Sequence, residues 1–234
     1  MIRAVGLCKK YGRTEVLRDF SLEMPAGKIT CIVGPSGCGK TTLLQLLAGL
    51  EEPDAGRVEG VAGRRLSYVF QEPRLLPWKT VWENIAFVLG SGGPAAAERA
   101  ERFLRAMGLW EFKNSYPKEL SGGMKQRAAL CRAFAYPHDV LFLDEPFKSL
   151  DTPLRLALVR LLAEMWAGSP RPVIIVTHDI FEALLLGHRV VVLSPRPAKV
   201  LEELEIDLPH AGRSPSRRPL PELYERILGL LSGS

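Results

Sequence analysis

The chain has 234 residues, of which 47% are hydrophobic and 24% are charged, with a formal net charge of +5. That length suits one domain or a core with a subdomain, and the composition is sufficient for an ordinary soluble core. No apolar run reaches the roughly 18 residues that a membrane-spanning helix needs, and the N-terminus lacks the apolar segment of a signal peptide. The sequence therefore predicts a cytoplasmic protein.

The cysteines and the basic residues point to no special chemistry. The four cysteines are far apart, without a CxxC pair or a histidine at metal-ligand spacing, so we expect buried, reduced thiols. The basic stretch RSPSRRP, 213–219, is interpreted as a solvated segment, with attraction to nucleic acid or anionic lipid as the alternative. No nucleic-acid partner is expected for the chain.

Short apolar, β-branched runs recur along the chain and predict the strands of a sheet. They are ITCIV, LSYVF, VLFL, VIIVT and RVVVL, at 29–33, 66–70, 140–143, 173–177 and 189–193. Helix-like stretches separate them, at 41–50, 95–109 and 153–166. Because the strands are apolar throughout rather than alternating, both faces of the sheet should be covered. The sequence therefore predicts a doubly wound α/β fold, a parallel sheet flanked by helices.

Residues 72–135 differ from the rest because they show mainly helical patterning and no convincing strand, with a break at GSGGP, 90–94. We interpret them as a helical subdomain inserted into a core formed by 1–71 and 136–209, which includes an N-terminal β region. The segment 210–234 is predicted to be a basic tail that ends in a short amphipathic helix, LPELYERILGLL.

Polar side chains come directly after four of the predicted strands. GPSGCGKTT comes after the first, Gln71 after the second, Asp144 and Glu145 after the third, and His178 after the fourth. In open parallel sheets, ligands bind beyond the carboxyl ends of the strands. These groups should therefore meet at one edge of the sheet and form a single site.

The stretch GPSGCGKT, 34–41, matches in full the P-loop pattern G-x-x-x-x-G-K-[ST]. Its glycines let backbone N–H groups curl around phosphate, Lys40 would reach the terminal phosphates, and Thr41 would offer its hydroxyl to Mg²⁺. A glycine-rich turn of structural value only is the alternative. The predicted nucleotide-binding residues of this loop are Gly34, Pro35, Ser36, Gly37, Cys38, Gly39, Lys40 and Thr41.

The polar residues after the later strands are candidates for catalysis and metal binding. Asp144 would hold a water on Mg²⁺, although an acidic residue there can also cap a helix. Glu145 would polarise the attacking water, a general-base contribution of about 10²–10⁴ in rate. Gln71 would complete the metal or water shell, or lie in an ordinary turn. His178 would contact the γ-phosphate or the attacking water, or be a structural histidine.

A second glycine motif, LSGGMKQR at 120–127, stands just ahead of a helix-like run, an arrangement that binds anions through free backbone N–H groups. The P-loop, Gln71, this motif, VLFLDEP and His178 occur in the order and spacing of one family. The chain resembles the nucleotide-binding cassette of ABC transporters over roughly residues 1–210. The resemblance implies that the ligands are ATP and Mg²⁺.

The resemblance also implies a purpose for the second glycine motif. Ser121, Gly122 and Gly123 would cap the γ-phosphate held by the P-loop of a second copy of the chain, in a head-to-tail dimer with two ATP molecules between the copies. Closure would then depend on the γ-phosphate, and hydrolysis would release it. The alternative is a helix N-cap with glycines for tight packing.

Further positions match the family one by one. Tyr11 would stack on adenine, Thr42 would supply the second hydroxyl of the P-loop, and Asp151, in Ser149-Leu150-Asp151, would communicate across the dimer. Lys148 departs from the family pattern, which often has a small residue there. That departure leaves the geometry of the loop before Asp151 open.

The segment QEPRLLPWKTVWENI, with EPFKSLD and VVLSPRPAKV, is similar to the importer branch that takes up nitrate, alkanesulfonates, taurine and related compounds. We favour sulfonates by resemblance alone. The likeness implies membrane-spanning permease subunits that dock near Leu75, Leu76 and Trp78 through an amphipathic helix, although these residues could instead belong to the subdomain core. An extracytoplasmic solute-binding protein would be an indirect partner.

The prediction is therefore an ATPase subunit of an ABC importer on the inner face of the cell membrane. An exporter cassette is the first alternative, and QEPRLLPW disfavours it. A soluble ABC ATPase acting on DNA or ribosomes usually carries a long coiled coil or two cassettes, and the sequence has neither. A non-catalytic binding module is the last alternative, against which Lys40, Asp144 and Glu145 argue.

Overall fold

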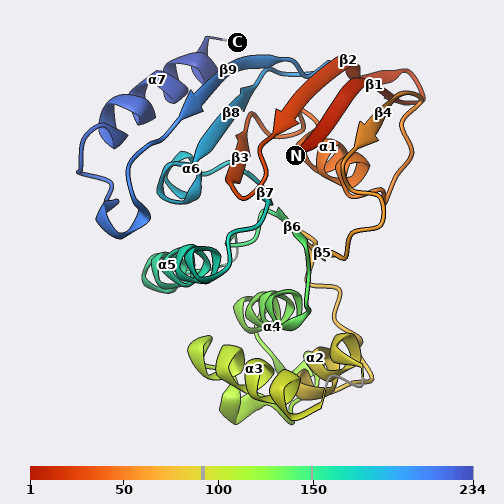
Figure 1. Cartoon of the computed structure of the whole chain (residues 1–234), viewed down its shortest axis with the longest axis vertical. Coiled ribbons are helices and arrows are strands. Elements are labelled where there is room, and N and C mark those ends of the chain that lie inside the picture. Colours follow the sequence, from red (N-terminus) through yellow and green to blue (C-terminus); the bar gives the residue numbers. More distant parts are fainter. Residues whose placement is uncertain (91–92, 149, 234) are drawn as a thin grey trace.

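The computed structural model describes residues 1–90, 93–148 and 150–233. Ser91 and Gly92, in the predicted break, and Ser149, ahead of Asp151, lie outside the described residues. A large lobe, which holds both ends of the described chain, is joined to a smaller helical lobe (Figure 1). Among the described residues, none of the helices has the length and apolar character that crossing a membrane requires.

The large lobe is built on a six-stranded sheet, whose strands are β3 (Ile29–Val33), β5 (Leu66–Val69), β6 (Val140–Asp144), β7 (Val173–Thr177), β8 (Arg189–Leu193) and β9 (Val200–Glu205). Their order across the sheet is β5-β6-β7-β3-β8-β9. The five predicted strands pair in parallel, and β9 pairs antiparallel with β8 at one edge. The carboxyl ends of the parallel strands therefore lie at one edge, as predicted.

Both faces of this sheet are covered, as continuous apolar strands require. In β6, Leu141 and Leu143 belong to one apolar cluster, whereas Phe142 between them belongs to another. The second cluster includes Leu43 and Leu44 of the first helix, and the first cluster extends into the other helices. The helices of the large lobe are α1 (Lys40–Leu47), α5 (Thr152–Gly168), α6 (Ile180–Leu186) and α7 (Leu220–Ser232).

The N-terminal β region is a separate, antiparallel sheet in the order β2-β1-β4, which packs with α1 (Figure 1). Its strands are β1 (Ile2–Tyr11), β2 (Thr14–Met24) and β4 (Ala55–Glu59). The sequence did not locate these strands, because they are half exposed. Apolar residues in such strands alternate with polar ones and give a weaker signal than buried runs.

The small lobe contains α2 (Val81–Leu89), α3 (Gly93–Ala106) and α4 (Gly122–Ala135), with 3₁₀ turns at Trp110–Phe112 and Pro117–Glu119. The described part of 72–135 contains no strand, as the helical patterning predicts. Helix α2 begins with a capping box: the Thr80 hydroxyl accepts from the Glu83 N–H, and the Glu83 carboxylate accepts from the Thr80 N–H.

The segment after β9 folds back onto the large lobe, so the prediction of a solvated basic tail was wrong for part of it. Arg213 donates hydrogen bonds to the carbonyls of Leu184, Leu185, Gly187, Ile206 and Leu208. Three of these carbonyls belong to the open end of α6, which a cation caps well. Burial lowers the pKa of Arg213 to about 10. Leu220 and Ile227 of α7 are buried, whereas Arg217 and Arg218 are exposed.

Candidate nucleotide-binding site

The P-loop connects β3 to α1, and its path depends on two glycines. Gly37 and Gly39 have φ angles of +77° and +114°, which residues with a side chain rarely adopt. A Cβ on Gly39 would also lie 2.4 Å from Cγ1 of Val16, so the loop can approach β2 only with glycine at this position. Cys38 packs into the apolar core, and therefore only its backbone is available to a ligand.

Lys40 is 7% exposed, and its ammonium group lies inside the P-loop. It donates to the carbonyl oxygens of Gly34 at 2.8 Å and Pro35 at 3.0 Å. These bonds hold the loop in its curled shape before a ligand arrives. Phosphate oxygens are stronger acceptors than neutral carbonyls, so an incoming triphosphate would compete well for Lys40.

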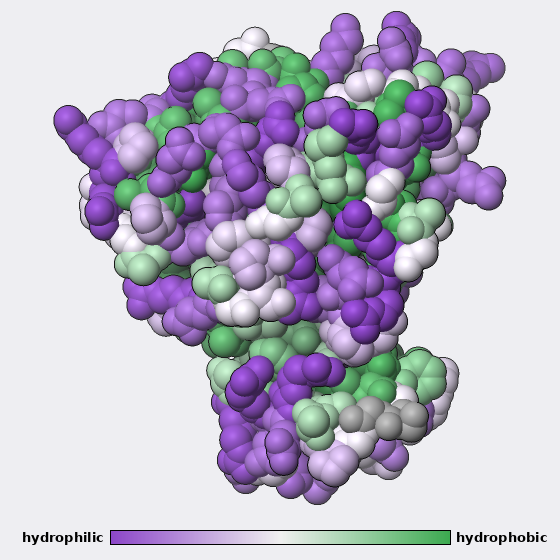
Figure 2. Space-filling view, in the orientation of Figure 1, coloured by the Kyte–Doolittle hydropathy of each residue, from purple (hydrophilic) through white to green (hydrophobic). Residues whose placement is uncertain are grey.

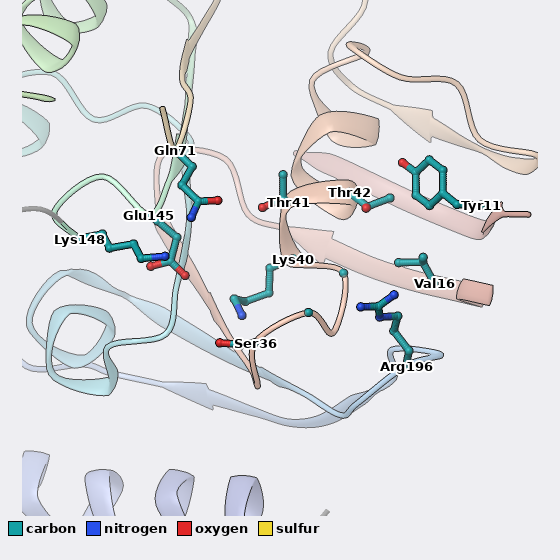
Figure 3. A pocket seen from close by; sticks show the side chains of 12 residues that line it. Tyr11, Val16, Ser36, Lys40, Thr41, Thr42, Gln71, Glu145, Lys148 and Arg196 are labelled. Carbon is teal, nitrogen blue, oxygen red and sulfur yellow. The ribbon is translucent and has the colours of Figure 1, made fainter. Parts of the chain in front are cut away.

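A cavity of about 360 Å³ opens beside the P-loop (Figure 3). Its wall brings together residues from several distant segments of the chain, namely Tyr11, Val16, Ser36, Gly37, Gly39, Lys40, Thr41, Thr42, Gln71, Glu145, Lys148 and Arg196. The structure thus collects Gln71 and Glu145 around the P-loop, where the sheet-edge argument expected them, together with Tyr11 and Thr42, which the family resemblance had singled out. The volume of the cavity lies in the range of sites for small ligands, which span about 300–1,000 Å³.

Asp144 ends β6 with a side chain that is almost fully buried. Its carboxylate accepts a hydrogen bond of 3.0 Å from the Thr41 hydroxyl. Burial raises the pKa of Asp144, and the Thr41 hydrogen bond opposes that rise. Mg²⁺ prefers oxygen ligands. The site offers three such groups, namely the Thr41 hydroxyl, the buried Asp144 carboxylate and the Gln71 amide on the cavity wall. These residues therefore fit a Mg²⁺ ion.

Glu145 has a φ of +47°, a left-handed conformation that costs a residue with a side chain roughly 1 kcal/mol or more. Its N–H donates to the Val176 carbonyl, which ties the turn to β7. Its Oε2 lies 2.6 Å from Nδ1 of His178. An ionised carboxylate only accepts hydrogen bonds, so the His178 proton sits on Nδ1 in this pair. The pair joins the ends of β6 and β7.

A second network supports the turn that carries His178. Glu182 is 5% exposed, and its carboxylate accepts a hydrogen bond of 2.8 Å from the Thr177 hydroxyl. Arg155 of α5 contacts Asp179 at 2.8 Å and Glu182 at 3.7 Å. Burial raises the pKa of Glu182 to about 7. The turn is therefore anchored to both α5 and α6.

We expect Glu182→Gln to flatten the pH dependence of stability in the near-neutral range. The carboxyl has a raised pKa in the folded protein, so the folded state binds its proton more tightly than the unfolded chain does. The wild type therefore loses stability as the pH rises from the usual value of 4.5 to about 7, by up to roughly 3 kcal/mol. Urea denaturation at about pH 5 and about pH 8 measures this difference. An equal fall in stability in Glu182→Gln would contradict this prediction. Glu225→Gln, on the exposed surface of α7, is the control.

The signature residues Ser121, Gly122 and Gly123 lie at the start of α4 and do not line the cavity. The Ser121 hydroxyl accepts a hydrogen bond of 3.3 Å from the Met124 N–H, which is the N-cap geometry that the alternative interpretation expected. Ser121 and Gly122 are exposed. Asp151, the N-cap residue of α5, is also exposed and outside the cavity wall. These residues are thus available to another molecule.

The signature helix is nevertheless connected to the site through Gln126. This side chain is 2% exposed, and its amide donates a hydrogen bond of 3.0 Å to the Pro146 carbonyl. Pro146 comes immediately after Glu145. A movement of α4 relative to the large lobe must therefore strain or break a contact beside the proposed base.

Arg196 is the charged cavity residue that sequence reasoning missed, and Lys148 lines the same cavity. Arg196 lies in the loop between β8 and β9, with its guanidinium against the P-loop (Figure 3): a Cβ on Gly37 would lie 2.9 Å from its Nη2. The same sheet-edge rule that selected the other candidates would have found it, because it comes after a predicted parallel strand.

The predicted docking residues differ in exposure. Trp78 is 70% exposed, whereas Leu75 and Leu76 are half buried and Leu75 packs against the large apolar cluster. The subdomain-core alternative therefore describes Leu75 better. Phe87 of α2, which the sequence did not single out, is 65% exposed and lies 5.9 Å from the Lys79 ammonium. Figure 2 shows hydrophobic surface at the neck between the lobes and over the α2 side of the small lobe.

Comparison with known proteins shows the family of the chain. The family model described as ABC transporter matches residues 17–148, more than half of the chain. The chain belongs to the ABC transporter family. An aliphatic sulfonates import ATP-binding protein of Burkholderia cenocepacia is 42% identical to this family member over 231 residues, covering 94% of this chain and 85% of the relative. One of the same description from Bacillus cereus is 37% identical over 227 residues, covering 94% and 90%.

Solved ABC structures share the fold. A dimeric bacterial ABC transporter cassette matches with a TM-score of 0.80 and 28% identity, over 88% of this chain and 98% of that chain. A dimeric cassette in a post-hydrolysis state, bound to ADP and Pi, matches with a TM-score of 0.79 and 27% identity, over the same shares. The predicted fold class is confirmed, and so is the prediction of an ATP-hydrolysing subunit of an ABC importer.

Proposed function

We propose that this ABC family ATPase drives uptake of a small sulfonate through separate permease subunits, as a head-to-tail dimer on the inner face of the membrane. The main observation in favour of the dimer is that the P-loop and the second glycine motif lie apart in one copy of the chain. The P-loop lines the cavity, whereas Ser121 and Gly122 are exposed and outside its wall. A second copy would bring its signature residues to this cavity, and Asp151 would communicate between the copies. The sulfonate rests on the names of the relatives.

Within the cavity, each segment contributes one part of nucleotide binding. Tyr11, 47% exposed at the end of β1, would stack on adenine, with its hydroxyl held by Glu51 at 2.5 Å. The backbone of the P-loop would surround the phosphates, Lys40 would exchange its carbonyl acceptors for phosphate oxygens, and Thr42 would add a hydroxyl. Mg²⁺, which neutralises phosphate charge, would be held by Thr41, Gln71 and, through a water, Asp144.

Glu145 would accept a proton from the attacking water as that water approaches the γ-phosphate. His178, at 2.6 Å from the Glu145 carboxylate, holds that carboxylate in place through Nδ1 and would turn its other ring nitrogen toward the phosphate. The left-handed turn and the Val176 hydrogen bond fix the base before substrate arrives. Pre-positioning of this kind lowers the barrier because no reorganisation is needed during the reaction.

We expect Arg196→Ala to weaken ATP and ADP binding by about 10- to 100-fold, since its guanidinium, beside Gly37, would donate a charge-assisted hydrogen bond to the phosphates. Fluorescence titration with a labelled nucleotide measures the dissociation constant. Arg217→Ala, which removes an exposed arginine from the C-terminal segment, should leave it unchanged. Equal affinity of Arg196→Ala and the wild type would remove Arg196 from the nucleotide site.

A pull-down of the tagged chain from detergent-solubilised membranes of its native cell tests the transporter role. We expect a polytopic membrane protein at near one-to-one stoichiometry, and less of it with Trp78→Ser, because the exposed Trp78 and Phe87 would contact a helix of the permease. Leu50→Ser, which changes a residue 54% exposed beyond α1, is the control. Recovery of soluble proteins or nucleic acid alone would contradict the importer.

Growth tests address the solute. Deletion of the gene should abolish growth with an alkanesulfonate as the only sulfur source and leave growth on sulfate unchanged, and the wild-type chain should restore it. Unimpaired growth on alkanesulfonates together with a loss of nitrate or taurine use would move the proposal to another solute, while leaving the importer itself in place.

A further inference from the structure

A hollow of about 500 Å³ lies between α3 of the small lobe and α5 of the large lobe, and we call it the α3–α5 hollow. A second depression adjoins this hollow and shares Arg99 and Arg171 with it. The second depression is lined by the residues just before β3, β5, β6 and β7. The α3–α5 hollow thus lies toward the amino ends of the strands, whereas the nucleotide cavity lies at their carboxyl ends. Nothing in the ATPase chemistry described above uses it.

The α3–α5 hollow concentrates positive charge that the protein does not neutralise. Arg99, Arg102 and Arg171 line it, and none of the three forms an ion pair with any residue in the described part of the chain. The Nε of Arg99 is buried without a hydrogen-bond partner. Within the described residues, the Arg171 guanidinium donates only to the His138 carbonyl, at 2.9 Å. Burial, and then the charge of Arg99, lower the pKa of Arg171, so the two guanidinium groups repel each other.

The carboxylates nearby offset this charge only in part. Glu164 lines the hollow but is exposed and makes no ion pair among the described residues. Asp139, in the adjoining depression, is already paired with Arg65 at 2.7 Å. An anion placed between Arg99 and Arg171 would therefore relieve the repulsion, and oxyanions accept hydrogen bonds from guanidinium groups particularly well.

The rest of the wall is apolar and aromatic. Phe103 and Phe134 are nearly buried and meet edge to face, with ring centroids 5.9 Å apart, and Tyr136, Leu161 and Met165 complete this side. The volume far exceeds that of an inorganic anion, since a water molecule occupies about 30 Å³ in the liquid. The hollow therefore suits a molecule with an oxyanion head and an apolar body.

We propose that the α3–α5 hollow binds a small organic anion, with a phosphate or sulfonate head held by Arg99, Arg102 and Arg171 and an aromatic or aliphatic body against Phe103 and Met165. The two walls of the hollow belong to different lobes. The bound anion consequently links α3 to α5 and resists movement of the small lobe relative to the large one.

Calorimetric titration of the full chain with phenyl phosphate tests this proposal, in saturating ADP so that the P-loop is filled. We expect saturable binding that Arg99→Gln with Arg102→Gln weakens by about tenfold or more, since two charge-assisted contacts are lost. Arg160→Gln, which removes an exposed arginine of α5 outside the hollow, should not change the affinity. Benzenesulfonate in place of phenyl phosphate distinguishes a sulfonate head from a phosphate head.

A second variant keeps the arginines. Gly168 lines the hollow at the end of α5, and a Cβ there meets nothing within 4 Å, so Gly168→Glu adds a competing carboxylate without a clash. It should also weaken phenyl phosphate binding. The proposal is overturned if phenyl phosphate does not bind, if the arginine variants bind it as the wild type does, or if inorganic phosphate binds equally well, since the apolar wall would then contribute nothing.

Discussion

Glu145→Gln is expected to lower ATP turnover by about 10²–10⁴-fold while ATP still binds. The glutamine oxygen can accept the hydrogen bond that the glutamate receives from His178 Nδ1, so the geometry of the turn should persist. An amide cannot take a proton from water, and therefore the chemical step alone is removed. Because the γ-phosphate then stays in place, the ATP-bound dimer should accumulate.

Phosphate release and size-exclusion chromatography with ATP measure the two effects together. Glu98→Gln, which neutralises an exposed residue of α3, should turn over ATP at the wild-type rate. Normal turnover in Glu145→Gln would show that Glu145 is not the base. His178→Ala then becomes the informative variant, since loss of activity in it alone would assign proton transfer to the histidine.

Ser121→Arg is expected to abolish the ATP-dependent dimer, and with it nearly all hydrolysis, while each monomer still binds ATP with unchanged affinity. Ser121 is exposed at the start of α4 and outside the cavity wall, so a large cation there does not touch the nucleotide of its own chain. It would instead occupy the space that the γ-phosphate of the partner needs. Analytical ultracentrifugation with ATP and a nucleotide titration measure dimer formation and binding separately.

The serine also caps α4, and removing a cap costs about 1 kcal/mol, so the variant needs a matched control. Ser121→Ala loses the same cap without adding bulk, and it should retain part of the dimer. Equal loss of the dimer in both variants would show that the effect comes from the lost helix cap and not from a clash with the partner's γ-phosphate. Weaker ATP binding by the Ser121→Arg monomer would place the signature in its own chain's site and contradict the two-copy arrangement.

The sequence predicted the parts of the site that depend on buried strands. Continuous apolar runs identify β3, β5, β6 and β7 without reference to partners, and the residues directly after each run must lie at one edge once the strands are parallel. Gln71 and Glu145 were located in this way, and the structure places both on the cavity wall. Arg196 obeys the same rule, but its segment, VVLSPRPAKV, was used only as a sign of family likeness and the arginine was given no role.

Other features depend on contacts that no local pattern encodes. The left-handed conformation of Glu145 is held by the Val176 carbonyl from a neighbouring strand, and a glutamate in the sequence gives no sign of it. Arg213 was interpreted as a solvated charge, because its five carbonyl acceptors become available only where α6 and β9 end beside each other. The half-exposed strands β1 and β2 likewise take their register from each other.

The carbonyl contacts of Arg213 have a consequence for how the chain reaches its native state during synthesis. Helix α6 comes directly after the turn of His178, and its last carbonyls stay open until Arg213 has left the ribosome. The nascent chain can pair β7 with β3 and β6 before Arg213 is synthesised. At that stage the turn of His178 is followed by a helix whose C-terminal end is uncapped. The C-terminal end of α6 is therefore completed only after the segment that follows β9 has been synthesised.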